Sequence, residues 1–403
     1  MRILKVYQPS ELKRIMQEIR VDPYGIKIML AKAIPCLIKL NSVSNITANI
    51  LKQEMLSLGG DVAVSRDALT GRAKLTDCLL IANLSQFNRL HQKLHKQPFG
   101  LNKLGGELSR VLKNYQREKF TLELGKYKLN LGRRTHIMGI VNLTPDSFSG
   151  DGFYKLTNLR TSELKNRIVN YARQLVKDGA DIIDVGGESS RPGARPVSVK
   201  EELKRTIPVI KALSRKINVP VSIDTYKPEV AEAALDNGVS LVNDITGLRN
   251  PGMAKVIARY KAGVVIMHMK GSPRTMQKNP QYLSLIDEII DYLGKAINRA
   301  EASGIDKEKI IIDPGLGFGK SAGHNLEILK RLREFKVLGR PILVGPSRKS
   351  FIGKILNAKP QDRMFGTVSS CVLAANSGVD ILRVHDVKEV KEALKVSDAI
   401  LNR

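Results

Sequence analysis

The sequence contains no tryptophan, only three cysteines and few aromatic residues, 5% in all. Cys36, Cys78 and Cys371 are odd in number and lack the spacing of metal ligands, so we interpret them as free thiols in a reducing compartment. No run approaches the ~18 uninterrupted apolar residues of a membrane-spanning helix. Because the first residues, MRILKVYQPSEL, contain no apolar leader core, we expect a cytoplasmic protein with no membrane partner.

Acidic residues are scarce beside basic ones, 39 against 66, which gives a net charge of +27. Residues 1–135 hold 24 basic and 10 acidic residues, and the remaining 268 hold 42 and 29. This excess favours anionic partners, either phosphorylated metabolites or nucleic acid. The basic residues are scattered and do not form the runs of about 5–8 that indicate a nucleic-acid patch. We therefore prefer a general lysine-rich composition as the explanation and do not expect nucleic acid as the main partner.

Eight short apolar segments recur between residues 136 and 386, with stretches of helical periodicity between them. The expected strands are 136–142, 181–187, 220–225, 241–246, 264–269, 310–315, 342–347 and 381–386. The expected helices include 164–176, 201–213, 228–235, 286–300 and 326–332. Eight alternations of strand and helix are typical of a closed (β/α)₈ TIM barrel, an α/β fold in which the carboxyl ends of all strands meet at one mouth.

The chain is longer than the ~250 residues of one barrel, so a further domain is expected. Residues 1–119 predict a small basic α/β domain, a sandwich with one antiparallel pair. Its expected strands are 3–7, 36–43, 61–65 and 77–82, and its expected helices are 10–19, 47–57, 86–96 and 107–115. Residues 120–135 alternate apolar and polar and predict a hairpin-like connector that plugs the base of the barrel. Residues 136–403 then form the barrel, the catalytic domain.

Polar residues that accept hydrogen bonds stand at the ends of four expected strands. They are Asp184, Asp224, Asn243 and Asp313. One aspartate at a strand end can be explained as a helix cap, as for Asp224 before Pro228, but capping does not explain four such ends. A ring of acceptors in an apolar cavity suits a neutral heterocycle rich in N–H donors, such as a guanidine-like pyrimidinone edge.

Basic residues follow the last two expected strands. Ser347-Arg348-Lys349-Ser350 precede an expected helix, and Arg383 and His385 lie two residues apart, so both point to one face of their strand. Phosphate groups bind near the seventh and eighth strands of many barrels. The segment GLGFGK, residues 315–320, resembles a phosphate loop but lacks the spacing of one, and Phe318 there is better suited to stack on a flat ring.

Two long segments at the mouth are expected to be loops. Residues 142–153 contain glycine, proline and polar residues, and a loop of this length above a barrel is more often a lid than packing. Residues 184–194 contain paired glycines, which allow close approach of the backbone to a ligand, followed by Ser189, Ser190 and Arg191, whose side chains suit an anion. The glycine pair alone is equally well explained as a tight turn.

Eight segments together resemble the dihydropteroate synthase family, in that family's order. They are IMGIVNLTPDSFS, IIDVGGESSRPGA, VSIDT, VNDITG, MHMKGSPRTMQ, IIDPGLGFGK, VGPSRKSFIG and LRVHDV. The resemblance implies a transferase of folate biosynthesis and a sulfonamide target. Such an enzyme condenses 6-hydroxymethyl-7,8-dihydropterin diphosphate with p-aminobenzoate to 7,8-dihydropteroate and pyrophosphate. It also implies Mg²⁺ and a homodimer formed through barrel helices. It does not extend to the first 130 residues.

The resemblance also implies roles for individual residues. The pterin would be bound by Asp184, Asp224, Asn243, Asp313 and Lys349 between apolar walls made by Ile245, Met267 and Phe318. The diphosphate would be held by Asn142, Arg383 and His385, with Asn142 also a ligand of Mg²⁺. The p-aminobenzoate would meet Ser190, Arg191, Pro192 and Ser350. The residues expected to act in catalysis are Asp184, Asp224, Lys349, Arg383 and His385. Many family members have threonine where this chain has Ser190, which bears on affinity for p-aminobenzoate and sulfonamides.

Two alternatives remain open at the level of sequence. A methyltetrahydrofolate:corrinoid methyltransferase has the same kind of acidic pterin pocket, but it binds no diphosphate and has no use for the basic residues at 347–350 and 383–385. The second alternative is a non-catalytic protein, either nucleic-acid-binding or regulatory, with the basic first third as its binding module and a barrel that has lost activity. The intact lid, pterin and diphosphate residues argue against that loss, and an added RNA-binding role for residues 1–135 stays open. The role of residues 1–135 is not indicated by any motif.

Overall fold

A computed structural model describes residues 2–4, 9–98, 100–144, 161–189 and 194–401 of the chain. The chain forms two units, Met1–Lys113 and Asn114–Arg403. The division falls earlier than the boundary after residue 119 that the sequence suggests. Each unit buries a separate set of apolar side chains. No helix among the described residues is long and apolar enough to cross a membrane.

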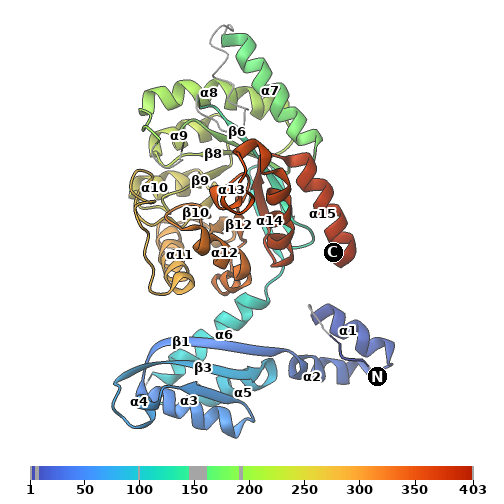
Figure 1. The fold of residues 1–403 in the computed structure, drawn as a ribbon, viewed down its shortest axis with the longest axis vertical. Helices are drawn as coiled ribbons and strands as arrows, with labels where there is room; N and C mark the ends of the chain where they lie inside the picture. The colour runs from blue at the N-terminus through green and yellow to red at the C-terminus, as the bar shows by residue number, and fades with distance from the viewer. Residues whose placement is uncertain (1, 5–8, 99, 145–160, 190–193, 402–403) are drawn as a thin grey trace. The chain divides into compact units, whose positions relative to one another are not determined.

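The N-terminal unit contains a three-stranded sheet and a set of helices (Figure 1). The strands β1(Pro35–Ser44), β2(Asp61–Val64) and β3(Leu75–Asn83) lie in the order β1-β3-β2, and both pairs are antiparallel. The expectation of a single antiparallel pair was therefore wrong. The helices are α1(Pro9–Glu18), α2(Pro23–Ala33), α3(Asn45–Ser57), α4(Arg66–Leu69), α5(Leu84–Leu94) and α6(Leu101–Gln116), of which α2 and α4 were not predicted. Part of the strand expected at 3–7 lies outside the described residues.

Local capping and one apolar cluster account for this small unit. The side chains of Ser44 and Asn83 accept hydrogen bonds from Thr47 N and Gln86 N, which stabilises the first turns of α3 and α5. Apolar side chains of α3, α5, α6 and the sheet then pack together, among them Leu51, Leu80 and Phe87. The unit thus has a core of its own.

A hairpin precedes the barrel. Strands β4(Phe120–Leu124) and β5(Tyr127–Leu131) pair antiparallel, and burial alternates along β4 as the sequence pattern requires. The buried side chains Phe120, Leu122 and Leu124 belong to one cluster with apolar side chains from the bases of the barrel strands. The base of the barrel is therefore filled by this hairpin.

Eight parallel strands form the barrel. They are β6(His136–Asn142), β7(Ile182–Gly186), β8(Val221–Asp224), β9(Leu241–Asp244), β10(Gly263–Met267), β11(Ile310–Asp313), β12(Leu343–Val344) and β13(Ile381–Val384). Their order is β11-β10-β9-β8-β7-β6-β13-β12, and a bridge between Ile312 and Ile342 joins the two end strands. All eight strands occur where the sequence predicts them, and the predicted barrel fold is confirmed.

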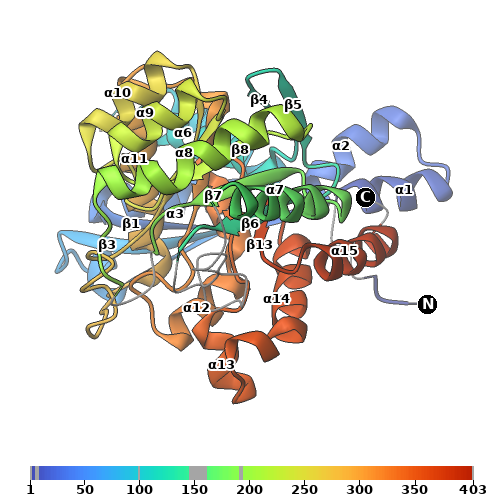
Figure 2. The ribbon, with the colours of Figure 1, turned by 90° about the horizontal axis from the view of Figure 1, so that it is seen from above.

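Helices surround these strands, as Figure 2 shows from above. They are α7(Thr161–Lys177), α8(Val199–Lys216), α9(Pro228–Asp236), α10(Pro251–Arg259), α11(Leu285–Ala302), α12(Ala322–Lys330), α13(Ser350–Leu356), α14(Met364–Asn376) and α15(Val387–Leu401), with short 3₁₀ turns η2(Lys307–Lys309), η3(Leu332–Leu338) and η4(Pro360–Asp362). The alternation of strand and helix predicts helices where α10, α14 and α15 lie, but their bounds were not predicted. The apolar faces of the helices and the outward side chains of the strands form the main core.

Candidate active site

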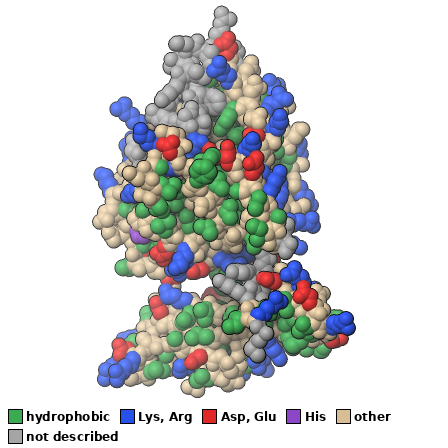
Figure 3. Space-filling view, turned by 45° about the vertical axis from the view of Figure 1, so that its right-hand side comes forward, with side chains coloured by type: hydrophobic (Ala, Val, Ile, Leu, Met, Phe, Trp, Pro, Cys, Tyr) green, Lys and Arg blue, Asp and Glu red, His purple; other side chains and the backbone are tan. Residues whose placement is uncertain are grey.

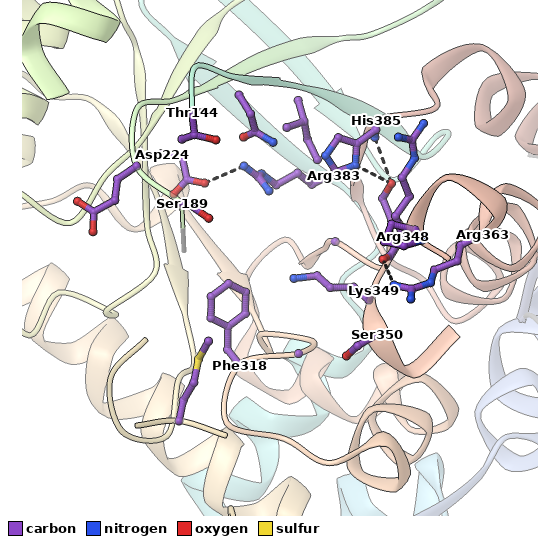
Figure 4. Close-up of a pocket in the computed structure, with 18 of the residues that line it drawn as sticks. Thr144, Ser189, Asp224, Phe318, Arg348, Lys349, Ser350, Arg363, Arg383 and His385 are labelled. Carbon is purple, nitrogen blue, oxygen red and sulfur yellow. Dashed lines mark hydrogen bonds and ion pairs between the residues drawn. The ribbon is translucent and has the colours of Figure 1, made fainter. Parts of the chain in front are cut away.

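The carboxyl ends of the strands surround a cavity of about 640 Å³. Residues far apart in the sequence meet there because parallel strands in a barrel all end at the same rim. Figure 4 shows their side chains directed toward a common space. The lining residues are Ile140, Asn142, Thr144, Glu188, Ser189, Asp224, Met276, Gln277, Gly317, Phe318, Gly345, Ser347, Arg348, Lys349, Ser350, Pro360, Arg363, Arg383 and His385.

Buried hydrogen-bond acceptors lie at the ends of β7, β8, β9 and β11. Asp184 is fully buried and Asn243 is 4% exposed, and Asn243 Nδ2 donates to Asp184 Oδ2 at 3.3 Å. The other carboxylate oxygen, Asp184 Oδ1, has no hydrogen-bond partner among the described residues. Burial raises the pKa of Asp224 to about 7 and that of Asp313 to about 6, against the influence of nearby cations. The structure thus brings all four predicted acceptors to the mouth.

Arg383 on β13 connects this acidic group to the cavity. Its Nε donates to Asp184 Oδ2 at 2.6 Å, and its Nη2 donates to Asp224 Oδ2 at 2.7 Å. Arg383 and Asp224 line the cavity, whereas Asp184, Asn243 and Asp313 do not. From the sequence, Arg383 was grouped with the basic residues that follow the last two strands, but its guanidinium contacts two of the acceptors directly. It forms part of the floor of the cavity.

An apolar wall stands beside the acceptors. Ile245, Met267 and Phe318 belong to one buried cluster, as their predicted positions require, together with Met269 and Met276. The ammonium of Lys349 lies 4.5 Å from the centre of the Phe318 ring, a cation–π arrangement. An apolar wall with a cation over one of its rings suits an aromatic heterocycle that carries a carbonyl group.

The residues after β12 and β13 form the basic part of the rim. Ser347 Oγ lies 3.0 Å from His385 Nδ1 and accepts from the His385 amide at 3.2 Å. Arg348 is paired with Asp386, with Nε 3.1 Å from Oδ2. Ser350, the first residue of α13, also lines the cavity. Arg348, Lys349 and His385 all line the cavity, and Arg348 is in addition ion-paired with Asp386.

The remaining predicted residues divide between the cavity and the undescribed part of the chain. Asn142 lines the cavity, and with it Thr144. Ser190, Arg191 and Pro192 lie outside the described residues, as does most of the expected lid at 142–153. At the start of the second loop, Glu188 accepts a hydrogen bond from Tyr226 Oη at 2.8 Å.

Sequence reasoning missed several lining residues. Thr144, Glu188, Met276 and Gln277 fall within motifs quoted above, so the motifs contained the signal although no role was drawn from it. Ser189, which was expected only to suit an anion, also lines the cavity. Arg363 lies beyond the last motif of that region, and its Nη1 donates to the carbonyl oxygen of Arg348 at 3.0 Å. The place of Arg363 in the lining could be found only from the fold, because α13 and η4 bring the chain back to the rim.

Comparison with known proteins identifies the family. The family model described as pterin binding enzyme matches residues 138–385. A dihydropteroate synthase of Synechocystis is 46% identical over 281 residues, covering 69% of this chain and 94% of the relative. A Halobacterium salinarum protein named as a probable bifunctional folylpolyglutamate synthase/dihydropteroate synthase is 39% identical over 394 residues, which is 97% of this chain and 46% of that protein. The second match includes the N-terminal unit.

Solved structures agree with the sequence matches. The dihydropteroate synthase of Yersinia pestis in a sulfonamide complex has a TM-score of 0.67 at 40% identity, covering 70% of this chain and 100% of that one. The Xanthomonas albilineans enzyme with 4-aminobenzoic acid has a TM-score of 0.65 at 40% identity, covering 71% and 99%. With a matching family model, close relatives and a shared fold, this chain belongs to the dihydropteroate synthase family of pterin-binding enzymes, transferases of folate biosynthesis.

Proposed function

We propose that the mouth cavity binds 6-hydroxymethyl-7,8-dihydropterin diphosphate and p-aminobenzoate and joins them with release of pyrophosphate. The observation that supports this most strongly is the contact of Arg383 with Asp184 and Asp224 at the floor of the cavity. A guanidinium and the amino-pyrimidinone edge of a pterin present similar N–H groups. The acidic floor therefore already holds a group shaped like the substrate's edge.

In this proposal the pterin ring replaces Arg383 on the carboxylates. Its amino, amide and ring nitrogens would contact Asp184, Asp224, Asn243 and Asp313, and Asp184 Oδ1 supplies an acceptor without a partner among the described residues. Lys349 would reach the ring carbonyl while Ile245, Met267 and Phe318 enclose the faces. Filling these buried acceptors matters because an unpaired buried polar group costs about 1–3 kcal/mol.

Arg383, once displaced, would be free to meet the diphosphate. With His385 and Asn142 it would hold the leaving group, and all three line the same cavity. Charge-assisted hydrogen bonds to phosphate oxygens are the strongest that these side chains make. Binding of the pterin ring and binding of the diphosphate would thus both depend on the same movement of the Arg383 side chain.

The residues at the rim also fit a magnesium ion carried by the substrate. No cluster of three or more His, Cys, Asp or Glu side chains that could hold a metal occurs among the described residues. Mg²⁺ commonly keeps several waters and binds through one or two protein oxygens plus substrate phosphates. Asn142 lines the cavity, and its Oδ1 lies 3.4 Å from where a Cβ on Gly186 would stand, so it would supply such an oxygen. When bound, the ion would neutralise charge on the leaving diphosphate.

The second substrate would lie nearer the rim. Ser350 lines the cavity next to Lys349 and would meet the carboxylate of p-aminobenzoate. Ser190, Arg191 and Pro192 would complete this part of the site. The 4-aminobenzoic acid in the Xanthomonas albilineans structure and the sulfonamide in that of Yersinia pestis support a site for such molecules in this fold.

The chemistry follows from these positions. The C–O bond between the pterin methylene and the diphosphate breaks, and the electron pair leaves with the diphosphate, whose charge Arg383 and His385 stabilise. The resulting pterin cation is stabilised by Asp184 and Asp224. The arylamine nitrogen then forms a bond to the methylene carbon and loses a proton. Because an arylamine is a weak nucleophile, a dissociative route from which water is excluded fits better than direct displacement.

Pyrophosphate release by the full chain tests the function. With the pterin diphosphate, Mg²⁺ and p-aminobenzoate we expect stoichiometric pyrophosphate and dihydropteroate, and neither product without the pterin. Methyl transfer from methyltetrahydrofolate to a corrinoid, with no pyrophosphate, would instead support the methyltransferase alternative. The presence of Lys349 and His385 in the cavity argues against that outcome.

We also propose that two copies of the chain associate through α13 and α14. The two helices pack at Gly366, where an added Cβ would lie 2.4 Å from Ile352 Cγ2. Four large apolar side chains on them are 50–79% exposed, namely Ile355, Leu356, Phe365 and Leu373. Hydrophobic side chains gather on the face of the barrel seen in Figure 3. A twofold interface would cover such a patch on both copies. Light scattering should show a dimer that Phe365→Glu weakens and that Lys255→Glu, at an exposed position of α10, does not.

A further inference from the structure

The segment GLGFGK, residues 315–320, lies against the chain that follows β10. A Cβ added at Gly315 would stand 2.0 Å from the carbonyl oxygen of His268, and one at Gly319 would stand 2.6 Å from that of Lys270. Both glycines also have φ in the left-handed region, at 72° and 63°. The two backbones are therefore in direct contact along this stretch. The segment is a support for Phe318 rather than a phosphate loop.

Lys320 places its ammonium between these two segments. The side chain is 3% exposed, and its Nζ donates to the carbonyl oxygen of Phe318 at 3.0 Å and to that of His268 at 3.5 Å. His268 Nδ1 lies 2.9 Å away. Lysine carries three N–H donors, so these three groups satisfy it fully if the imidazole accepts.

The imidazole of His268 is suited to accept. Burial, with Lys320, Arg249 and Lys270 nearby, lowers the pKa of His268 to about 2, so the ring is neutral at physiological pH. Its edge packs against Tyr292, with ring centres 4.8 Å apart. A neutral, fixed imidazole beside a buried ammonium is a stable arrangement, and it ties the end of β10 to the loop that carries Phe318.

The charge of Lys320 also acts on Asp313. Burial raises the pKa of Asp313, and the Gly315 amide, Lys349, Lys320 and Arg383 all oppose that rise. Burial lowers the pKa of Lys320 to about 7, and Asp313 opposes it. Of the three cations, Lys349 and Arg383 face the cavity, whereas Lys320 does not line it. Lys320 is thus a counter-charge behind the wall, positive below about pH 7 and not in contact with what the cavity binds.

We propose that Lys320 is a positioning residue of the pterin site: its buried ammonium holds Phe318 against the end of β10 and keeps Asp313 ionised as an acceptor. The inference rests on the proposed assignment of Asp313 and Phe318 to the pterin. It gives the glycine-rich segment a task that does not involve phosphate. Lys320 acts through Asp313 and Phe318 and need not touch the substrate.

The test compares three variants of the full chain. Lys320→Met removes the charge at similar length, and Lys320→Arg retains it. Lys336→Met removes another buried lysine, 8% exposed, from η3, which precedes β12 and so lies toward the base of the barrel. Binding of 6-hydroxymethylpterin, which lacks the diphosphate, is measured by calorimetry from about pH 5 to about pH 8, with KM and kcat for the pterin diphosphate beside it.

We expect Lys320→Met to move the acid limb of binding, the pH range over which protonation of Asp313 weakens affinity, upward by about one pH unit, since removal of a nearby positive charge raises a carboxyl pKa. Affinity should then fall about tenfold near pH 5 and about twofold near pH 7. Lys320→Arg should leave that limb in place and raise KM a few-fold, because its larger head displaces Phe318. Lys336→Met should bind the pterin like the unaltered chain.

The inference is overturned if Lys320→Met melts like Lys336→Met and yet keeps both the affinity and the acid limb of the unaltered chain. Should Lys320→Met not fold, Lys320→Gln takes its place with the same expectations. An acid limb shifted equally by Lys320→Arg would refute the role of the charge. Failure of the proposed function is distinct, since the unaltered chain would then neither bind the pterin nor release pyrophosphate.

Discussion

The inside of the barrel has two layers of different character on the same strands. Near the base, Ile182, Leu241, Ile311 and Ile381 belong to one apolar cluster with the hairpin. Two residues further along β7, β9, β11 and β13 stand Asp184, Asn243, Asp313 and Arg383. Because side chains alternate along a strand, residues two apart face the same interior. On each of these strands, the residue nearer the base packs in the core, and the residue two positions further on belongs to the proposed binding site. Substitutions on one strand can therefore alter stability and binding separately.

The largest effect is expected for Arg383→Ala, a substitution in the layer nearer the mouth. The change removes the ion pairs of Asp184 and Asp224 and the proposed contact with the diphosphate. We expect turnover to fall at least ~100-fold, as for loss of a group that stabilises charge in the transition state, with a smaller loss of pterin affinity. Steady-state kinetics and pterin binding measure the two effects. Turnover within about twofold of the unaltered chain would contradict the assignment.

Two changes on β11 compare the layers directly. Ile311→Ala leaves a cavity at the base and should lower the free energy of unfolding by about 2–5 kcal/mol with KM unchanged. Asp313→Asn should raise KM for the pterin about tenfold or more while stability changes little, since a buried charge is removed without loss of volume. Chemical unfolding and kinetics on both proteins check the pair. If Ile311→Ala and Asp313→Asn change unfolding free energy and KM in the same way, the two layers do not act separately.

The two layers should also respond differently to pH. The pKa values of Asp224 and Asp313 are raised by burial to about 7 and about 6, so both carboxyls lose their charge as the pH falls through this range. Pterin binding should then weaken about tenfold per pH unit between pH 7 and pH 6, where Asp224 is protonated, and about a hundredfold per unit below pH 6, where Asp313 is protonated as well. Stability should change in the opposite direction. A raised carboxyl pKa means that the native state binds protons more tightly, so these groups stabilise the fold most below their unfolded pKa and least above pH 7.

The smallest effect is expected for Gly263→Ala at the start of β10. An added Cβ would lie 2.5 Å from Leu124 Cδ2 of the hairpin, so that flexible side chain must shift. We expect a loss of about 1 kcal/mol in unfolding free energy and unchanged kcat and KM. Thermal melting and pyrophosphate release provide the measurement. A change in KM would show that the base and the mouth are coupled.

Local sequence patterns predict many of the strands and helices of this fold, but not all of their bounds or their order in the sheets. The strand β6 begins and ends where the apolar run does, whereas β12 has only two residues, because Gly345 and Pro346 interrupt it and proline has no amide to donate. The bounds of helices α14 and α15 were not predicted although both helices are regular. In the N-terminal unit the order β1-β3-β2 depends on which strands meet, which no local pattern states.

The sequence predicted many of the residues that lie at the site, but not the hydrogen bonds and ion pairs between them. The positions of Asp184, Asn243 and Asp313 follow from strand ends and fold topology. The contact of Arg383 with Asp184 joins residues 199 positions apart and depends on the reach of one side chain across the barrel. The task of Lys320 likewise depends on burial and on two backbone carbonyls, which the letters GLGFGK do not reveal.

The hairpin seal at the base has a consequence for the sequence of events. Because Phe120, Leu122 and Leu124 fill the base of the barrel, a molecule bound at the floor of the cavity would enter and leave through the rim. In the proposed arrangement the arylamine sits above the pterin, so an arylamine that arrives early bars the passage. In that arrangement binding would be ordered, with the heterocycle entering before the arylamine and the product leaving through the rim.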